Sequence, residues 1–458
     1  MNREEMQACP PSSIAVVGCG HVGLVTAAGM ASLGHQVVGI DKNPDLVQQL
    51  SRGSVPFLER GLPELTSQML AEGRLTFTTS YTDALREAKF VFLCVNTPPT
   101  ATGAPDIRYV RMAAAALGEE LATRGRQPII INKSTSPIGT GERIDAILST
   151  FITQDNGHSG IVANPEFLRE GSAVYDFFHP DRIVIGADSE VNAQAVAQLY
   201  EGIDAPLVMT DLRSAEMIKY VSNAYLATRV SFVNEIARLC EALNLDVDPI
   251  VTGAGMDPRI GQHFFKPGIG YGGSCLPKDV AALCYTGDSA GISMRLLSSV
   301  QEINLGQRRH AVQCLRQALG TLEGRTIAVW GITFKGGSED LRESPALDVI
   351  RLLQNEGARI QAYDPSQVTD GDLEDAVLLS EDAIDAVKGA DALAVLTDWP
   401  EFTQVDFAEV LASMPGRYVY DGRNILKREH VEAVGGIYQG MGRPITHEGQ
   451  FHASVSQP

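Results

Sequence analysis

The sequence lacks any long hydrophobic run. Its 458 residues are 44% hydrophobic, but no apolar stretch approaches the roughly 18 residues that a membrane span needs. The opening segment MNREEMQACPPSS also lacks the apolar centre of a signal peptide. We therefore expect a cytoplasmic protein with no membrane partner. A chain of this length also predicts more than one domain.

Closely spaced cysteine pairs and an excess of positive charge are absent too. The seven cysteines are scattered without a CxxC pair, so we expect neither a disulfide framework nor a zinc site, and no metal. Cys19 and Cys94 lie in or beside apolar strand patterns and are interpreted as packing residues. The formal charge of −19 argues against nucleic acid as a partner, although local basic residues can still hold a small anion.

A glycine motif stands between a predicted strand and a predicted helix. Residues 14–17, IAVV, precede Gly18, Gly20 and Gly23 at GxGxxG spacing, and a second strand ends at Asp41. Glycines at this turn let the backbone approach a pyrophosphate, which the N-terminus of the helix attracts. An acid after the second strand can bind a ribose hydroxyl and repels a 2′-phosphate. The motif therefore predicts NAD rather than NADP.

Two further apolar runs end in polar residues. Residues 89–99 end in Asn-Thr-Pro around Thr97, and residues 127–140 end in Lys-Ser-Thr around Thr135. Polar side chains at the carboxyl ends of parallel strands line the ligand crevice of a doubly wound sheet. Either run can instead be an ordinary turn that contains proline.

The C-terminal third repeats the opening of the chain. Residues 326–331 resemble residues 14–18, and residues 356–366 resemble residues 33–44. We therefore predict an α/β protein with two Rossmann-like, doubly wound domains. The repeat has GITFKGG where the first copy has GCGHVG, so we do not expect a second full dinucleotide site. Lys335 and Arg342 in this loop are either phosphate partners or solvated charges.

A long helix is predicted between the two halves. Residues 211–245 contain no glycine or proline, and apolar residues recur at spacings of three and four. Such a helix can join two domains and form a dimer interface. Lys219 and Asn223 are four residues apart and share one face, which either looks into a ligand cleft or lies at the surface. The predicted domains are residues 1–210, 211–310 and 311–458.

The stretch GGSCLPKD, residues 272–279, carries a candidate nucleophile. Cys275 follows two glycines and precedes Lys278 and Asp279. Most lone cysteines are inert and buried, but a thiol with a lowered pKa is a nucleophile. A thiol combined with a dinucleotide site indicates aldehyde oxidation through a thiohemiacetal and a thioester.

Four segments together resemble the UDP-glucose/GDP-mannose dehydrogenase family. They are NPEFLREGSAVYDFFHPDRIVIG (164–186), KYVSNAYLATRVSFVNEI (219–236), GIGYGGSCLPKD (268–279) and GITFKGGSEDLRESPAL (331–347). The resemblance runs from about residue 13 to 430 and follows the family's order in all three domains. It implies a two-step, NAD-dependent oxidation of a sugar-nucleotide primary alcohol to a carboxylate.

The resemblance also implies roles for individual residues. Cys275 matches the family's nucleophile, and Lys219, assisted by Asn223, matches the group that stabilises negative charge on the C6 oxygen. Glu166 matches the base for thioester hydrolysis, and Thr135 helps to hold the water.

The remaining assignments concern the ligands and a second subunit. Asp279 matches an acid that lies near the catalytic lysine, here Lys219, and near an ordered water. Arg259 matches an arginine that reaches across a dimer interface. The residues expected to contact NAD are Gly18, Gly20, Val22, Gly23, Asp41, Thr97, Thr135, Glu170, Lys278 and Arg342. Those expected to contact the sugar nucleotide are Glu166, Phe167, Leu168, Arg169, Glu170, Lys219, Asn223, Arg259, Phe264, Phe265, Lys266, Pro267, Gly268, Gly272 and Lys335.

Several alternatives stay open at the level of sequence. The stretches 170–186 and 268–273 favour UDP-glucose as substrate, with GDP-mannose as the alternative and an N-acetylhexosamine nucleotide less favoured. A non-catalytic nucleotide-binding regulator need not keep all of Cys275, Lys219, Asp279 and Glu166, and a single-step hydroxyacid dehydrogenase needs no cysteine. We expect a homodimer, and we interpret residues 436–458 as a partly mobile tail.

Two positions depart from the family's usual pattern. His21 stands where the family often has tyrosine, and GGSED follows Phe334 and Lys335 where the family more often has a proline and paired acids.

Overall fold

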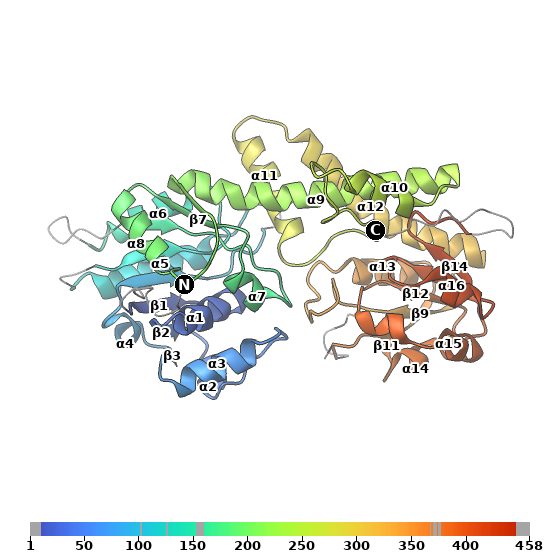
Figure 1. Cartoon of the computed structure of the whole chain (residues 1–458), viewed down its shortest axis with the longest axis horizontal. Helices are drawn as coiled ribbons and strands as arrows, with labels where there is room; N and C mark the ends of the chain where they lie inside the picture. The colour runs from blue at the N-terminus through green and yellow to red at the C-terminus, as the bar shows by residue number, and fades with distance from the viewer. Residues whose placement is uncertain are drawn as a thin grey trace, which may run out of the picture. The chain divides into compact units, whose positions relative to one another are not determined.

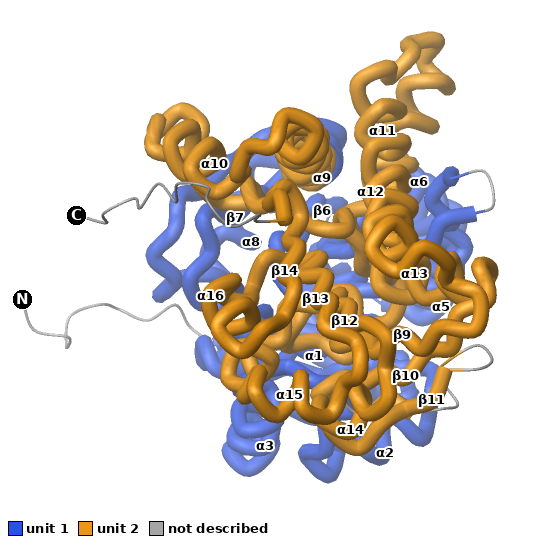
Figure 2. The backbone as a smooth tube through the Cα atoms, turned by 90° about the vertical axis from the view of Figure 1, so that its right-hand side faces the viewer, with its two compact units in different colours: residues 1–222 blue, residues 223–458 orange. Residues whose placement is uncertain are grey.

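A computed structural model describes residues 11–100, 103–124, 127–152, 160–366, 368–369, 373 and 377–445. The chain divides into two compact units, residues 1–222 and 223–458, which Figure 2 draws in blue and orange. Helix α9 (Leu212–Leu243) contains the boundary between them, as the sequence predicts for a long central helix. None of the helices within the described ranges is long and apolar enough to cross a membrane.

The first unit contains an eight-stranded sheet in the order β3-β2-β1-β4-β5-β6-β7-β8. All its pairings are parallel except the one between β6 and β7. The strands are β1 (Ser13–Val17), β2 (Gln36–Ile40), β3 (Leu75–Thr78), β4 (Phe90–Leu93), β5 (Ile129–Asn132), β6 (Ile161–Ala163), β7 (Ile183–Ala187) and β8 (Leu207–Thr210). The helices are α1 (His21–Ser32), α2 (Pro44–Ser51), α3 (Leu62–Ala71), α4 (Tyr81–Leu85), α5 (Arg108–Leu121), α6 (Thr140–Leu148), α7 (Ala173–Phe178) and α8 (Glu190–Gln198).

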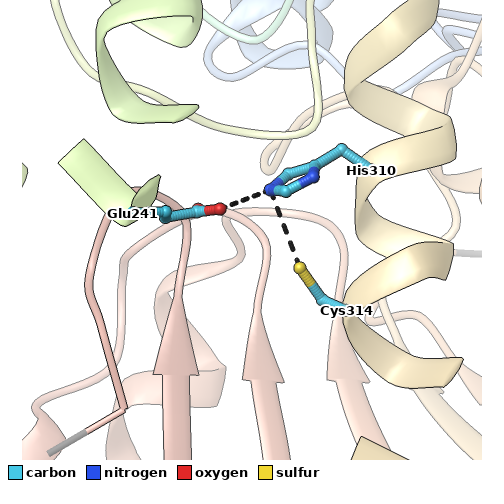
Figure 3. A group of neighbouring side chains, drawn as sticks. All are labelled: Glu241, His310 and Cys314. Atoms are coloured by element: carbon cyan, nitrogen blue, oxygen red, sulfur yellow. Dashed lines mark hydrogen bonds and ion pairs between the residues drawn. The ribbon is translucent and has the colours of Figure 1, made fainter. Parts of the chain in front are cut away.

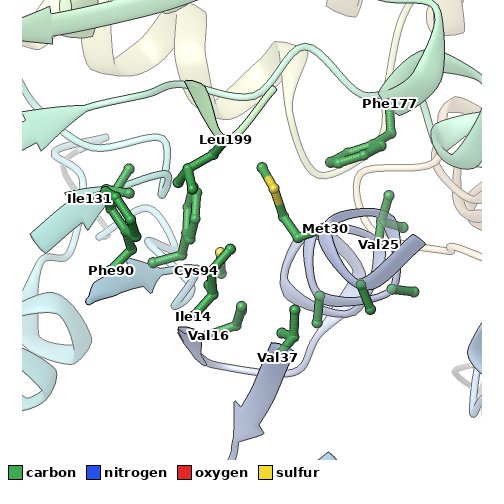
Figure 4. Close-up of a cluster of buried hydrophobic side chains, with 14 of the residues drawn as sticks. Ile14, Val16, Val25, Met30, Val37, Phe90, Cys94, Ile131, Phe177 and Leu199 are labelled. Atoms are coloured by element: carbon green, nitrogen blue, oxygen red, sulfur yellow. The ribbon is translucent and has the colours of Figure 1, made fainter. Parts of the chain in front are cut away.

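Helices cover both faces of this sheet (Figure 1). Ile14 and Val16 of β1 face a cluster that includes Val25 and Met30 of α1 (Figure 4), and residues of α7 and α8 complete it. Ala15 lies on the opposite face, in a cluster with residues of α5 and α6. Successive residues of each strand point to opposite faces of the sheet, and helices bury both faces. Every position of the strand is therefore apolar, which explains the continuous apolar runs in the sequence. The expected doubly wound sheet is therefore confirmed.

Cys19 and Cys94 are buried in the core of the first unit, which confirms their interpretation as packing residues. Burial raises the pKa of the Cys94 thiol to about 12, and burial likewise raises that of Cys19. Both thiols are therefore neutral and unreactive at physiological pH. Cys9 lies outside the described residues.

The second unit repeats the architecture with six parallel strands, in the order β11-β10-β9-β12-β13-β14. The order 3-2-1-4-5-6 of the Rossmann fold is thus present in both sheets. The strands are β9 (Thr326–Trp330), β10 (Arg359–Tyr363), β11 (Val377–Leu379), β12 (Ala392–Val395), β13 (Tyr418–Asp421) and β14 (Ile437–Gly440). The helices are α10 (Val247–Gly255), α11 (Leu276–Ser289), α12 (Arg295–Leu319), α13 (Pro345–Asn355), α14 (Ala383–Val387), α15 (Phe407–Ser413) and α16 (Arg428–Glu432), with a 3-10 helix η3 (Pro400–Gln404).

The interpretation of residues 436–458 as a partly mobile tail is wrong for residues 437–440, which belong to a sheet. Residues 437–440 form the edge strand β14, which pairs with β13. Tyr438 and Met441 are almost fully buried in the cores on opposite faces of this sheet. Only two large apolar side chains mark this strand among glycines and a glutamine, so its pattern is too short to read from sequence. Residues 446–458 lie outside the described residues.

Candidate active site

The glycine loop after β1 is shaped for close approach. A Cβ atom at Gly18, where φ is +90°, would lie 2.8 Å from the carbonyl oxygen of Cys94, and one at Gly23 would lie 1.7 Å from that of Gly18. Around Gly20, by contrast, an added Cβ would meet no described atom within 4 Å other than those of its chain neighbours and its own helix backbone. Gly20 is also the N-cap residue of α1, and the half-buried Val22 follows in its first turn. Protein packing thus demands glycine at positions 18 and 23, whereas Gly20 leaves room for a cofactor phosphate at the helix N-terminus.

Asp41 lies beside this loop, at the end of β2. Its two carboxylate oxygens accept the backbone N–H groups of Cys19 (2.9 Å) and Asn43 (3.0 Å). These bonds hold a negative charge next to the glycine loop, which is the arrangement that binds an adenosine ribose and disfavours a 2′-phosphate. The residues present therefore fit NAD.

Polar residues gather where β4, β5 and β6 end. Thr97 is buried, and its hydroxyl donates to the backbone oxygen of Thr135. The Thr135 hydroxyl lies 3.4 Å from Oε1 of Glu166. The structure thus brings together three residues that the sequence places far apart, because parallel strands end at the same edge of the sheet.

Lys219 and Glu166 form a buried ion pair in the first unit. Their Nζ and Oε1 atoms are 2.9 Å apart, and their side chains are 4% and 5% exposed. The other oxygen of Glu166 accepts the backbone N–H of Leu168 at 2.6 Å. Burial raises the pKa of Glu166, but attraction to Lys219 and the hydrogen bonds outweigh it and hold that pKa below its ordinary value. Glu166 is therefore a carboxylate that can accept a proton.

A small cavity lies beside Lys219. Its volume of about 10 Å³ is room for about one water molecule. Its lining comes from Asn132, Ser134, Thr135, Ser136, Ala163, Pro165, Glu216 and Lys219. A water there would lie beside Thr135 and Lys219.

Cys275 lies in the second unit, at the N-cap position of α11. Its side chain is half-buried, and its sulfur lies 3.6 Å from the Ser274 hydroxyl. The partial positive charge of a helix N-terminus favours a thiolate at this position. A Cβ atom at Gly272 would lie 2.2 Å from the backbone oxygen of Glu343, so glycine there lets the cysteine loop pack against the loop after β9.

Asp279 is fully buried in the first turn of α11. Its Oδ2 accepts the side-chain amide of Asn223 at 2.6 Å, and its Oδ1 pairs with the ammonium group of Lys278 at 2.6 Å. Lys278 therefore makes an ion pair with the neighbouring Asp279. Asn223 follows Lys219 by one turn of α9, as the spacing predicts.

The other expected ligand contacts are spread over both units. In the first unit, the guanidinium group of Arg182 lies 3.8 Å from the ring centre of Phe167. Arg169 forms an ion pair with Asp176 at 2.5 Å. Leu168 and Glu170 are half-buried. In the second unit, Phe264 and Lys266 are exposed, whereas Phe265, Pro267 and Gly268 are buried. Lys335 is half-buried, and the exposed Arg342 and Arg259 pair with Asp340 (2.7 Å) and Asp257 (2.6 Å).

Models of one protein family match the chain in three consecutive segments. The NAD-binding domain of the UDP-glucose/GDP-mannose dehydrogenase family matches residues 12–204, its central domain residues 213–305, and its UDP-binding domain residues 328–428. The chain belongs to this family. It is accordingly an NAD-dependent oxidoreductase, as the sequence predicted.

Named relatives support the same conclusion. The UDP-glucose 6-dehydrogenase TuaD of Bacillus subtilis is 41% identical over 433 residues, which is 94% of this chain and 93% of that protein. A UDP-glucose 6-dehydrogenase of Pseudomonas aeruginosa is 38% identical, covering 94% and 97%. Among solved structures, a UDP-glucose dehydrogenase from Pyrobaculum islandicum superposes with a TM-score of 0.89 at 38% identity, covering 95% of this chain and 99% of that one.

Two residues that the sequence did not single out hold the loops of this dehydrogenase in place. Glu59, 2% exposed, accepts the backbone N–H groups of Gly171 and Ala173 (both 2.8 Å) and pairs with His21 Nε2 at 2.7 Å. Arg423 donates to the backbone oxygens of Gly270 (3.2 Å) and Phe334 (3.0 Å). Neither lies in a motif, because both act by bonding backbone that is distant in sequence.

Replacing Glu59 with alanine is expected to destabilise the first unit. One buried and one half-buried backbone N–H group would lose their acceptor, at a cost of about 2–4 kcal/mol in the free energy of unfolding. NAD should also bind more weakly, because His21 begins the helix that follows the glycine loop. Urea unfolding and NAD titration measure both effects. The exposed Glu64→Ala in α3 is the control and should change stability by less than about 0.5 kcal/mol; equal losses in both variants would contradict the role of Glu59.

Proposed function

We propose that this dehydrogenase oxidises UDP-glucose to UDP-glucuronate in two successive steps, through covalent intermediates on Cys275. The setting of Cys275 carries the proposal: a half-buried thiol at the N-terminus of α11, beside a serine hydroxyl. A single-step alcohol dehydrogenase needs no such group, and neither does a nucleotide-binding regulator. NAD, when bound, accepts the hydride of each oxidation.

The residues of the chain divide the work of the first oxidation. Lys219 stabilises the negative charge that develops on the C6 oxygen, and Asn223 assists it. The Cys275 thiolate then adds to the C6 carbon of the aldehyde, forming a C–S bond, and the carbonyl oxygen takes up a proton. Held in this way as a thiohemiacetal, the aldehyde cannot escape before its second oxidation.

The second oxidation leaves a thioester on Cys275, which water must hydrolyse. The Glu166 carboxylate takes a proton from that water, and Thr135 orients it. The new C–O bond replaces the C–S bond, so the products are the carboxylate and the free thiol. The cavity of about 10 Å³ suits about one water molecule and is lined by Thr135, which supports the role of Thr135 in holding a water. Asp279 holds Asn223 and Lys278 in place.

The choice of UDP-glucose rests on three supports. The family's UDP-binding domain matches residues 328–428, the similar proteins reported above carry UDP-glucose in their names, and the stretch 170–186 favours the same substrate. We further propose that residues 1–210 bind NAD, that residues 211–310 link and dimerise, and that residues 311–458 bind the sugar nucleotide, with Lys335 on its phosphates. GDP-mannose remains the alternative substrate, and a cytoplasmic location stays a prediction.

The reaction stoichiometry tests this proposal directly. A limiting amount of UDP-glucose with excess NAD⁺ should yield two NADH per sugar nucleotide, because the alcohol loses two hydrides on its way to the carboxylate. Absorbance at completion measures the ratio. One NADH would mean that the reaction stops at the aldehyde, whereas turnover of GDP-mannose alone would overturn only the substrate.

We propose that the enzyme is a homodimer that buries one side of α9. Large apolar side chains recur along this helix and are 36–60% exposed: Met217, Val221, Tyr225, Phe232, Leu239 and Leu243. A stripe of this size on one helix is typical of an interaction surface. Sedimentation should therefore show a dimer, and Tyr225→Glu should shift it toward monomer. Tyr285→Glu, at an exposed position of α11, is the matched control; a monomeric parent protein would refute the proposal.

A further inference from the structure

Three metal-binding side chains meet in the second unit, away from the residues discussed above. Glu241 comes from α9, whereas His310 and Cys314 are one turn apart on α12. Nε2 of His310 lies 2.5 Å from Oε2 of Glu241 and 3.7 Å from the sulfur of Cys314, and the three ligand atoms lie within 4.8 Å of one another (Figure 3).

We propose that Glu241, His310 and Cys314 form a binding site for a divalent cation of the zinc type. One carboxylate oxygen, one imidazole nitrogen and one thiolate sulfur are the donor types that Zn²⁺ binds with four-fold coordination. The spacing of cysteines led us to expect no metal, because that test looks only for cysteine pairs close in sequence. The His–Cys pair four residues apart on α12 is the signal that it misses.

The geometry needs only a small adjustment. Zinc bonds of about 2.0–2.3 Å at tetrahedral angles place ligand atoms roughly 3.3–3.7 Å apart. The separation of 3.7 Å between His310 and Cys314 already fits. The separation of 2.5 Å between Glu241 and His310 is a hydrogen bond and must widen by about 1 Å as the cation takes the place of the shared proton.

Second contacts orient two of the ligands. Oε1 of Glu241 accepts the backbone N–H of Gly442 at 2.7 Å, which leaves Oε2 for the cation. The sulfur of Cys314 accepts the side-chain amide of Gln439 at 3.5 Å, and the Tyr418 hydroxyl donates to the other end of that amide. Outer hydrogen bonds of this kind orient ligands in metal sites.

The cluster is reachable from solvent. A cavity of about 530 Å³ lies against it, lined by Glu235, Arg238, Leu239, Glu241, Ala242, His310 and Gln313. The Glu241 and His310 side chains are each 15% exposed, whereas Cys314 is 3% exposed. A cation can thus enter from the cavity with a water as fourth ligand, and Cys314 closes the inner side.

The thiol is the group that changes state on binding. Burial and the nearby charge of Glu241 raise the pKa of Cys314 to about 12, so without a cation the side chain is a neutral thiol. Binding forms the metal–sulfur bond and releases the thiol proton to solvent. The alternative to a cation site is that hydrogen bonds alone hold these three side chains together. In that case no metal–sulfur bond forms when a divalent cation is added.

Cobalt titration of the full-length protein after chelator treatment distinguishes the two. Co²⁺ at the site should give a sulfur-to-cobalt charge-transfer band in the near ultraviolet and the intense visible bands of four-fold coordination. Zn²⁺ should remove both by competition. Cys314→Ser should abolish the charge-transfer band, whereas Cys275→Ser and Cys284→Ser should keep it.

Two further variants guard against a fold defect in Cys314→Ser. His310→Gln keeps the thiol yet should lose the four-fold visible spectrum, and Gln439→Leu should weaken cobalt binding by about 10- to 100-fold while leaving the ligands in place. Circular dichroism checks that each variant folds. No charge-transfer band in the parent protein, or a band that survives Cys314→Ser, would overturn the site. These outcomes do not depend on the dehydrogenase reaction.

Discussion

Replacing Cys275 with serine is expected to lower the rate of UDP-glucuronate formation by at least about 10⁴-fold, the scale on which enzymes lose activity with their nucleophile. A serine hydroxyl at the N-terminus of α11 is not ionised near neutral pH, so the aldehyde is no longer captured. The steady-state rate and the NADH yield per UDP-glucose measure the effect.

Cys284→Ser is the matched control for this variant. Cys284 is a half-buried thiol on the same helix, and burial raises its pKa. Its replacement should leave the rate and the yield of two NADH unchanged. If Cys275→Ser still produced two NADH per UDP-glucose at the parent rate, the covalent mechanism would be wrong and a single-step or thiol-independent chemistry would replace it.

Replacing Lys219 with methionine is expected to damage both catalysis and stability. The loss of the positive charge at the C6 oxygen should lower kcat by about 10²–10³-fold. The same change leaves the Glu166 carboxylate buried without its partner, which costs about 3–5 kcal/mol in the free energy of unfolding. Initial rates and urea unfolding report the two effects separately.

The double variant Lys219→Met, Glu166→Gln separates them further. It removes both charges, so most of the lost stability should return, because burial of an uncharged pair carries no charge penalty. Activity should stay low, since both the oxyanion partner and the base are gone. Recovery of activity together with stability would contradict the catalytic roles of this pair.

The stability loss of Lys219→Met should also depend on pH. In the parent protein the pKa of Glu166 lies below its ordinary value, so its ionised form contributes stability above that value and the contribution fades as pH falls. Burial raises the pKa of Glu166, and the attraction to Lys219 is the largest of the effects that lower it. Without Lys219, the pKa of Glu166 therefore rises. The loss should therefore be largest near about pH 7 and shrink toward about pH 4, where the buried Glu166 of the variant, with its raised pKa, is protonated and carries no unpaired charge.

The fold follows closely from local patterns. The apolar run at residues 14–17, the glycine spacing after it and the acid at Asp41 identify the first dinucleotide fold, and the weaker echo at residues 326–331 identifies the second. Strand β14 was missed because it contains only two apolar side chains, Ile437 and Tyr438, and the burial of Tyr438 depends on a sheet formed elsewhere in the chain.

The candidate site was only half visible in the sequence. Motifs singled out Glu166, Lys219, Cys275 and Asp279 by resemblance, but no pattern says which of them bond. The structure pairs Glu166 with Lys219, and Asp279 with Asn223 and Lys278. Each pairing is set by the packing of elements that are distant in the chain.

The sequence by itself determined the two Rossmann-like sheets, the long helix between them and the family. The hydrophobic periods of strands and helices and the glycines of turns can each be recognised within a few neighbouring residues. Tertiary structure alone decided which charges are buried together, which loops Glu59 holds, and that Glu241, His310 and Cys314 meet. The physical reason is that hydrogen bonds, ion pairs and metal ligation require contact within a few ångströms. Only the packing of α9 and α12, and the common edge of β4, β5 and β6, bring those side chains within that distance.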